Sequence, residues 1–146
     1  MTIKKQALGL AVIVVLAAAC GQKTSTGVSY DSASKSDIRK ACQTMLKGYA
    51  EAIPNTESQK REKKEIKPCC NDVAQAAGKL SGMERAYAAY DFLVAQDTKL
   101  TPNQIKSART VRDAIAGDLT LPQRTAAGRL RYTGLTCMSQ NARKKR

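Results

Sequence analysis

The residues of this sequence that could do chemistry are its cysteines, because the chain contains no histidine. Every mechanism that needs a histidine base, a histidine metal ligand or a histidine pH switch is therefore excluded. Four cysteines lie in the body of the chain, at Cys42, Cys69, Cys70 and Cys137. Zinc sites usually use cysteines two to four residues apart, and redox sites use Cys-x-x-Cys. Neither spacing occurs, so we expect structural disulfides and neither a metal nor another cofactor.

The fifth cysteine, Cys20, follows a segment with the layout of a signal peptide. Lys4 and Lys5 precede a 13-residue apolar stretch from Ala7 to Ala19. As a helix this stretch would cover roughly 20 Å, against about 30 Å of bilayer hydrocarbon. The stretch is therefore too short for a typical transmembrane helix. An uncleaved anchor and a buried core helix are the structural alternatives.

The end of this stretch, Leu16-Ala17-Ala18-Ala19-Cys20-Gly21, resembles the lipobox of bacterial lipoproteins. The resemblance covers residues 1–21 and implies that residues 1–19 are a signal peptide removed before Cys20. It also implies that Cys20 is acylated on its sulfur and on its new amino group, which attaches the protein to a membrane without a span. Gly21, in place of an aspartate after the cysteine, favours the outer membrane in enteric-type bacteria, with the domain facing the periplasm or the cell surface.

With Cys20 lipidated, an even number of cysteines remains in an oxidising compartment, which predicts two disulfides. A bond between the adjacent Cys69 and Cys70 would close a strained ring. Two pairings stay open: Cys42–Cys69 with Cys70–Cys137, or Cys42–Cys70 with Cys69–Cys137. Either pairing would tie the first and last helices to the start of the central one and stabilise a domain with a thin core.

Small and polar residues fill the sequence from Gly21 to Lys35, GQKTSTGVSYDSASK, and leave almost nothing to bury. We therefore interpret residues 20–35 as the lipidated cysteine and a flexible tether. Residues 36–140 are expected to form one folded helical domain. Residues 141–146 are expected to form a disordered, basic C-terminal tail.

Apolar residues recur at helical spacing through most of the domain, and strand signals are nearly absent. One amphipathic helix should cover residues 37–53, with Ser36 as its N-cap and Pro54 after its end. Residues 60–67 are expected to form a solvated turn or a short helix that ends before Pro68.

A longer helical region should follow over residues 69–97, where a capping signal at Ser81 divides it into two helices or kinks it. Thr101 should cap another helix that ends at Gly117, and a last helix should begin near Pro122. The chain is thus predicted to be all-α, a small four- to five-helix bundle stapled by two disulfides.

The chain carries 25 Lys and Arg against 12 Asp and Glu, a formal charge of +13. Across a membrane from the cytosol, such charge suits lipid headgroups, lipopolysaccharide phosphates, cell-wall polymers or acidic proteins, and we expect no nucleic acid partner. A solvated surface without a partner is the alternative. The clustered basic residues make a candidate binding surface: Lys60, Arg61, Lys63, Lys64, Lys67, Lys106, Arg109 and Arg112.

A small cell-wall-acting enzyme would fit the size and charge of the chain. Its site would need a general-acid carboxyl in a cleft that is usually lined with aromatic rings. The chain has no Trp and 4% aromatic residues. Glu51 and Glu84, the only carboxylates we could nominate, are better explained as a helix-surface residue and a capping residue. We therefore predict no catalytic residue.

We predict that the domain is a non-catalytic protein-binding module of a membrane-anchored lipoprotein. It would be an inhibitor or immunity protein, or an accessory subunit of an envelope secretion or conjugation machine. A rigid, stapled helical surface loses little disorder on binding. Met83, Tyr87, Tyr90 and Phe92 could anchor a partner, although the helical spacing of the first three favours the core. The alternative is a basic binder of anionic envelope polymer, lipopolysaccharide or cell wall.

Overall fold

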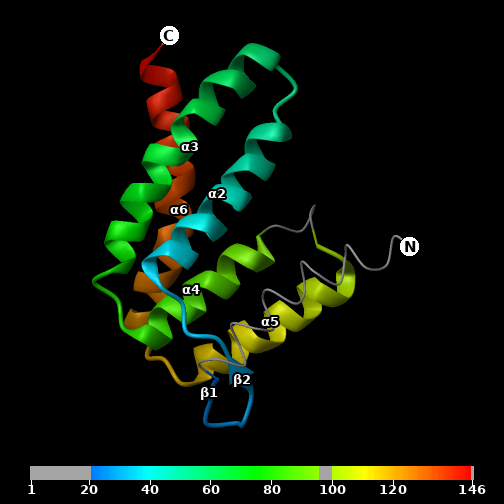
Figure 1. Ribbon diagram of the computed structural model, residues 1–146, viewed down its shortest axis with the longest axis vertical. Helices are drawn as coiled ribbons and strands as arrows, with labels where there is room; N and C mark the ends of the chain where they lie inside the picture. The colour runs from blue at the N-terminus through cyan, green and yellow to red at the C-terminus, as the bar shows by residue number, and fades with distance from the viewer. Residues whose placement is uncertain (1–20, 96–99, 146) are drawn as a thin grey trace.

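A computed structural model describes residues 21–95 and 100–145 of the chain. Within these residues, five helices and a two-stranded hairpin are arranged as shown in Figure 1. In chain order they are β1 (Gln22–Lys23), β2 (Ser29–Tyr30), α2 (Lys35–Glu51), α3 (Thr56–Ala77), α4 (Gly82–Val94), α5 (Pro102–Gly117) and α6 (Leu121–Lys144). Two disulfides cross-link the bundle. The predicted all-α bundle of four to five helices with two disulfides is confirmed.

The main core lies where α2, α3, α4 and α6 meet. Helix α3 packs on α2 and α6, and α5 packs on α4 (Figure 1). The largest buried side chains of this core are those of Phe92, Ile38, Met45, Leu46, Met138 and Val73. No helix among the described residues combines the length and the apolar character needed to cross a membrane.

Each helix begins at a residue whose side chain accepts a hydrogen bond from the first turn. The N-caps are Ser34, Asn55, Ser81, Thr101 and Thr120. The predicted caps at Ser81 and Thr101 are confirmed, and the chain does break into two helices between α3 and α4. The predicted cap at Ser36 is wrong. Ser34 is the cap because Asp37, three residues later, accepts from the Ser34 backbone N–H at 2.8 Å and completes a capping box.

Pro68 does not end a helix, contrary to the prediction. Helix α3 runs through it from Thr56 to Ala77. A proline inside a helix removes one backbone hydrogen bond and costs about 3 kcal/mol. The next two residues, Cys69 and Cys70, are both buried and are bonded to α6 and α2. These cross-links hold the second half of α3 in place and offset the cost.

The segment predicted as a flexible tether, residues 20–35, is folded over most of its described length. Residues 22–30 form an antiparallel hairpin in which Gln22 faces Tyr30 across the strands. Gly27 has a φ of +82° at the turn. The Tyr30 ring is only 3% exposed and packs with Ala86, Ile115 and Leu119 of the second core cluster. This one aromatic side chain docks a segment whose composition suggested a tether.

The C-terminal boundary also differs from the prediction. Residues 141–144, expected to belong to a disordered tail, continue α6. Ala142 is buried, and the Lys145 ammonium donates to the carboxylate of Glu65 on α3. Arg146 lies outside the described residues. Packing of α6 against α3 therefore extends the helical domain beyond residue 140.

Candidate functional site

The four body cysteines form the disulfides Cys42–Cys70 and Cys69–Cys137, with Cα–Cα distances of 5.6 and 5.8 Å. This is one of the two pairings that the sequence left open. Cys69 and Cys70 are consecutive on α3, so their side chains point about 100° apart around the helix axis. One faces α6 and the other faces α2. The disulfides therefore staple the three long helices into one rigid unit.

The basic residues predicted as one surface belong to two separate places. Lys60, Arg61, Lys63, Lys64 and Lys67 lie on the first half of α3. Lys106, Arg109 and Arg112 lie on α5, which packs on α4 away from α3 (Figure 1). The structure therefore does not bring the two sets together.

Arg112 belongs to an ion-pair cluster between helices and is not part of an open basic surface. Its guanidinium lies 3.3 Å from a carboxylate oxygen of Asp91, which is 6% exposed. Arg131 of α6 lies 3.4 Å from the other Asp91 oxygen. This cluster joins α4, α5 and α6 through one buried carboxylate. The sequence analysis missed Asp91 because a lone acid between Tyr90 and Phe92 carries no pattern of its own.

Met83, Tyr87 and Tyr90 are partly buried and pack against the second core cluster, while Phe92 is buried in the main core. The core position favoured for the first three by their spacing is confirmed. Phe92, considered as an anchor for a partner, is instead enclosed by the bundle. Of these residues, Tyr90 also lines an open site.

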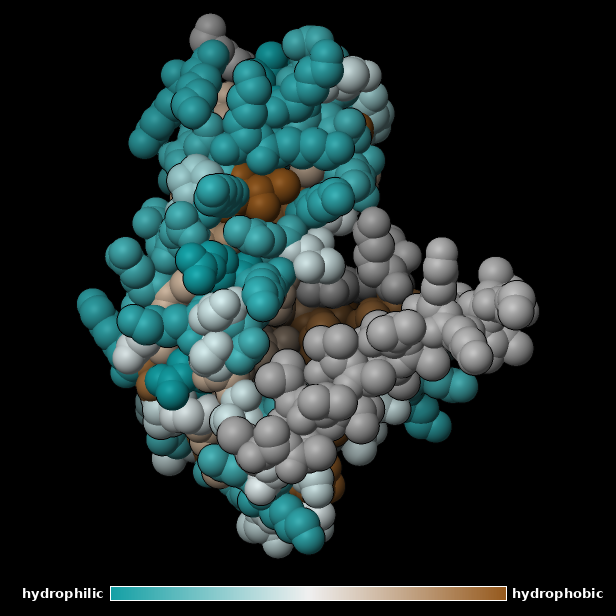
Figure 2. Space-filling view, in the orientation of Figure 1, coloured by the Kyte–Doolittle hydropathy of each residue, from teal (hydrophilic) through white to brown (hydrophobic). Residues whose placement is uncertain are grey.

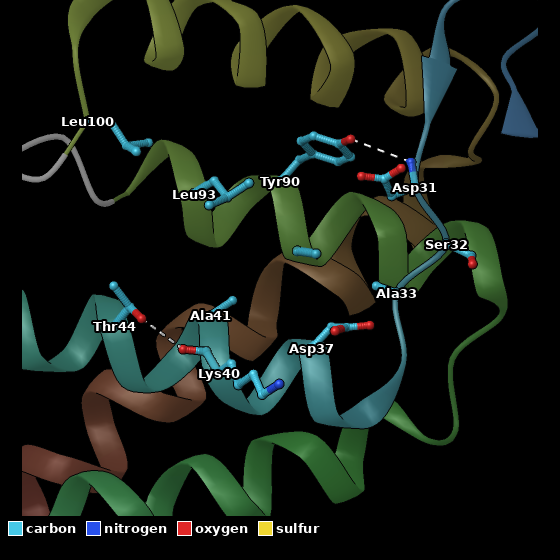
Figure 3. Close-up of a pocket in the computed structure, with 11 residues that line it drawn as sticks. Asp31, Ser32, Ala33, Asp37, Lys40, Ala41, Thr44, Tyr90, Leu93 and Leu100 are labelled. Atoms are coloured by element: carbon cyan, nitrogen blue, oxygen red, sulfur yellow. Dashed lines mark hydrogen bonds between the residues drawn. The ribbon is translucent and has the colours of Figure 1, made fainter. Parts of the chain in front are cut away.

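That site is a groove of about 380 Å³ between α2, α4 and the segment that leads from β2 into α2 (Figure 3). Its volume is within the range of ligand pockets. The apolar lining residues are Ala33, Ala41, Ala89, Leu93 and Leu100. The polar lining residues are Asp31, Ser32, Asp37, Lys40, Thr44 and Tyr90. Asp31 and Asp37 lie at one end, and Leu93 and Leu100 at the other. The groove is thus apolar along its length, and at its acidic end Asp31 and Asp37 outnumber the one cation among the described lining residues, Lys40.

Asp31 differs from the other lining residues in having a buried polar atom that forms no hydrogen bond within the described part of the chain. Its Oδ1 atom is buried and has no hydrogen-bond partner among the described residues. Burial raises the pKa of the Asp31 carboxyl above its ordinary value, and the nearby Asp37 charge raises it further. The Asp37 carboxylate already has hydrogen-bond partners, since it accepts from the Ser34 backbone N–H and from the Ser34 hydroxyl. A cation brought into this end of the groove would supply the partner that Asp31 lacks.

Tyr90 forms the wall beside Asp31. The Asp31 backbone N–H donates to the Tyr90 phenol oxygen at 3.5 Å (Figure 3). Burial raises the pKa of the Tyr90 phenol, so the ring stays neutral near neutral pH. The sequence analysis missed the acidic end of the groove because it placed Asp31 in the tether. Only the docking of the hairpin brings Asp31 beside Tyr90.

Among the described residues, no three His, Cys, Asp or Glu side chains are grouped so that they could hold a metal ion. Cys20 and residues 1–19, the predicted lipidation site and signal peptide, lie outside the described residues. No family model, curated protein or solved structure matches the chain.

Proposed function

We propose that this chain is a lipid-anchored bacterial envelope protein whose helical domain is a non-catalytic protein-binding module. The lipobox-like residues before Cys20 support the anchor, and the two disulfides suit an oxidising compartment outside the cytoplasm. The absence of histidine and the commitment of Asp37 to a helix cap support a role without catalysis. The outer membrane is the proposed location, with the domain facing the periplasm or the cell surface.

The observation that carries the proposal is the groove between α2 and α4. Its apolar lining comes mainly from α2, which a disulfide ties to α3, and from α4, which Phe92 anchors in the main core. A preformed apolar groove binds with little loss of conformational freedom, which favours affinity. Its volume has room for a few apolar side chains of a partner.

The charges of the groove define the partner's chemistry. A segment with apolar residues for the leucine end and one Lys or Arg for the Asp31 end would complement both. The cation would meet the buried Asp31 Oδ1 atom, which has no partner within the described residues. We therefore propose a protein partner that inserts such a segment, in an inhibitor or immunity pair or in an envelope secretion or conjugation machine.

Site-specific photo-crosslinking in intact cells tests this function. A photoreactive residue at Leu93, inside the groove, should give one discrete protein adduct. The matched control is Leu121, which is 67% exposed at the start of α6 and does not line the groove. The substitution Leu93→Arg should remove the partner from a pull-down, whereas Leu121→Arg should retain it. Identical adducts at both positions, or none at Leu93, would contradict the groove as the binding site.

The anchor is tested separately. Mass spectrometry of the mature protein should find acyl chains on an N-terminal Cys20, and the Cys20→Ser variant should leave the membrane fraction. A Cys20→Ser variant that stays membrane-bound in the same amount would contradict lipidation at this residue.

A further inference from the structure

The fold gathers two basic stretches at one end of the molecule. The first is the beginning of α3, and the second is the end of α6. We define the basic end as the residues Lys60, Arg61, Lys63, Lys64, Lys67, Arg143, Lys144 and Lys145. The same two stretches contain three acids, Glu57, Glu62 and Glu65. Figure 2 shows that this end of the molecule is covered mainly by hydrophilic residues.

A buried carboxylate holds the two stretches together. Glu65 is 3% exposed and accepts from the Lys145 ammonium, which fastens the end of α6 to α3. Lys60 pairs with Glu57 at 3.6 Å. No such pair involves the exposed Lys63, Lys64 or Lys67 within the part of the chain that the structure describes. The basic end therefore keeps a surplus of cations that face solvent.

The basic end lies opposite the point where the chain would leave a membrane. A single residue, Gly21, separates Cys20 from β1 in the sequence. The hairpin is fixed to the C-cap of α5, three residues before α6 begins, because the Ser25 backbone N–H donates to Asp118 at 2.7 Å. Helix α6 then spans 24 residues, which is roughly 36 Å, before it reaches Lys144 (Figure 1). With the predicted tether folded, the lipid anchor would hold the hairpin end at the bilayer.

That distance decides which anions the basic end can meet. The Debye length is about 8 Å at physiological ionic strength, so a membrane surface roughly 36 Å away exerts almost no attraction. With α6 directed away from the bilayer, the lipids of the anchoring membrane are out of reach of the basic end. Anionic polymer that is not part of that membrane remains within reach.

The residue types favour a polymer over a single shaped anion. Six of the eight basic residues are lysines, which are point charges on flexible stems, while arginine is the residue suited to bidentate recognition of one carboxylate or phosphate. We propose that the basic end binds anionic cell-wall polymer and so connects the anchored domain to the wall. The orientation, and with it the choice of polymer over the lipids of the anchoring membrane, rests on the proposed anchor at Cys20, whereas the surplus of exposed cations at the basic end does not.

Co-sedimentation of the full-length, detergent-solubilised protein with purified insoluble cell-wall polymer tests the binding. The test variant is Lys63→Glu/Lys64→Glu/Lys67→Glu. The control, Lys79→Glu/Lys106→Glu/Arg109→Glu, changes the net charge equally at exposed positions outside the basic end. The test variant should bind about 100-fold more weakly and depend less on salt, because each lysine near an anionic surface is worth roughly fivefold in affinity. The control should bind within about twofold of the wild type. Circular dichroism and a free-thiol assay verify that both variants are folded and oxidised.

Three results would overturn the proposal. Equal losses in both variants would mean attraction by net charge alone, and unchanged binding of the test variant would mean that another surface binds the wall. Failure of the wild type to sediment with the polymer would mean that the basic end does not bind the wall.

The orientation has its own test. The lipidated protein is placed in nanodiscs of neutral lipid or of mixed neutral and anionic lipid, and capture by the polymer is compared. Equal capture is expected. Loss of capture in anionic nanodiscs would place the basic end on its own membrane. A protein that carries no lipid at Cys20 would end the anchor proposal and leave the co-sedimentation result standing.

Discussion

At the scale of single residues, two carboxylates show how burial decides the effect of a charge. Asp91 and Asp113 lie at nearly equal distances from the Arg112 guanidinium, 3.3 and 3.2 Å. The side chain of Asp91 is 8% exposed and that of Asp113 is 63% exposed. A buried ion pair leaves an uncompensated buried charge when one member is removed, whereas an exposed pair is replaced by water.

We therefore predict that Asp91→Asn lowers the free energy of unfolding by about 3–5 kcal/mol. The matched substitution Asp113→Asn should lower it by about 1 kcal/mol or less. Urea denaturation of both oxidised variants measures the difference. Equal effects of the two substitutions would show that the Asp91 cluster does not join α4, α5 and α6.

The substitution Asp31→Asn should have opposite effects on the stability of the fold and on binding of the protein partner. Because burial and Asp37 raise its pKa, its contribution to stability is fully present below the ordinary carboxyl pKa and is lost as pH rises through the raised value. Asp31→Asn should therefore be at least as stable as the wild type at pH 7 and should bind the protein partner more weakly. Denaturation at acidic and neutral pH, with the pull-down, measures both. Unchanged partner binding would remove Asp31 from the proposed site.

At the scale of elements, the hairpin determines what the N-terminal segment does. Two of its residues hold it on the bundle: Tyr30 is buried, and Ser25 donates to Asp118. Each contact joins positions far apart in the sequence, so no local pattern announces it. The consequence is that a segment expected to separate the domain from the membrane becomes part of the domain.

The hydrogen bond from the Ser25 hydroxyl, and then the one from its backbone N–H, lower the pKa of the Asp118 carboxyl. The resulting stabilisation of the hairpin is present above the ordinary carboxyl pKa and is lost as pH falls through the lowered value. Ser25→Ala should raise the Asp118 pKa and weaken hairpin docking at neutral pH. An NMR titration of Asp118 and of the hairpin amides checks this, with the exposed Ser29→Ala as control. An unchanged Asp118 pKa in Ser25→Ala would contradict this account.

Two glycines of α6 should respond differently to the same substitution. A Cβ at Gly134 would lie 3.4 Å from the Cys42 Sγ atom and 3.5 Å from the Val73 Cγ2 atom, whereas nothing lies within 4 Å of a Cβ at Gly128. Gly128→Leu should stabilise the fold by about 0.5–1 kcal/mol through helix propensity. Gly134→Leu should destabilise it by about 1–3 kcal/mol through overpacking. Thermal unfolding measures both, and a stable Gly134→Leu variant would show that α6 can move away from α2.

At the scale of the whole molecule, the disulfides join distant parts of the chain. The cysteines of Cys42–Cys70 are 28 residues apart and those of Cys69–Cys137 are 68 apart. The chain-entropy model assigns about 3.6 and about 4.4 kcal/mol to loops of these lengths. These values are comparable with the whole stability of a small domain.

Replacing both cysteines of Cys69–Cys137 with serine should therefore destabilise the protein more than the same change in Cys42–Cys70. The expected losses are about 4 and about 3.5 kcal/mol, measured by denaturation at equal pH. Removing both disulfides should leave the chain unfolded at 37 °C. Retention of native helicity by the protein without either disulfide would refute their role as staples.

The helices were the most predictable part of this protein. Thr101 and Ser81 cap helices as predicted, because a capping residue acts within its own first turn. The effect of Pro68 was not predictable, because the cross-links that keep α3 continuous come from α2 and α6. The acidic end of the groove was equally hidden, since Asp31 and Tyr90 are 59 residues apart.

By itself, the sequence determined the helical class, the need for two disulfides, the excess of positive charge and the absence of histidine chemistry. These properties depend on composition and on spacing within one or two helical turns. Tertiary structure alone decided which cysteine meets which, where the hairpin docks, and that the charges of α3 and α6 share one end. Such contacts depend on which faces of distant segments bury each other, and local spacing does not contain that information.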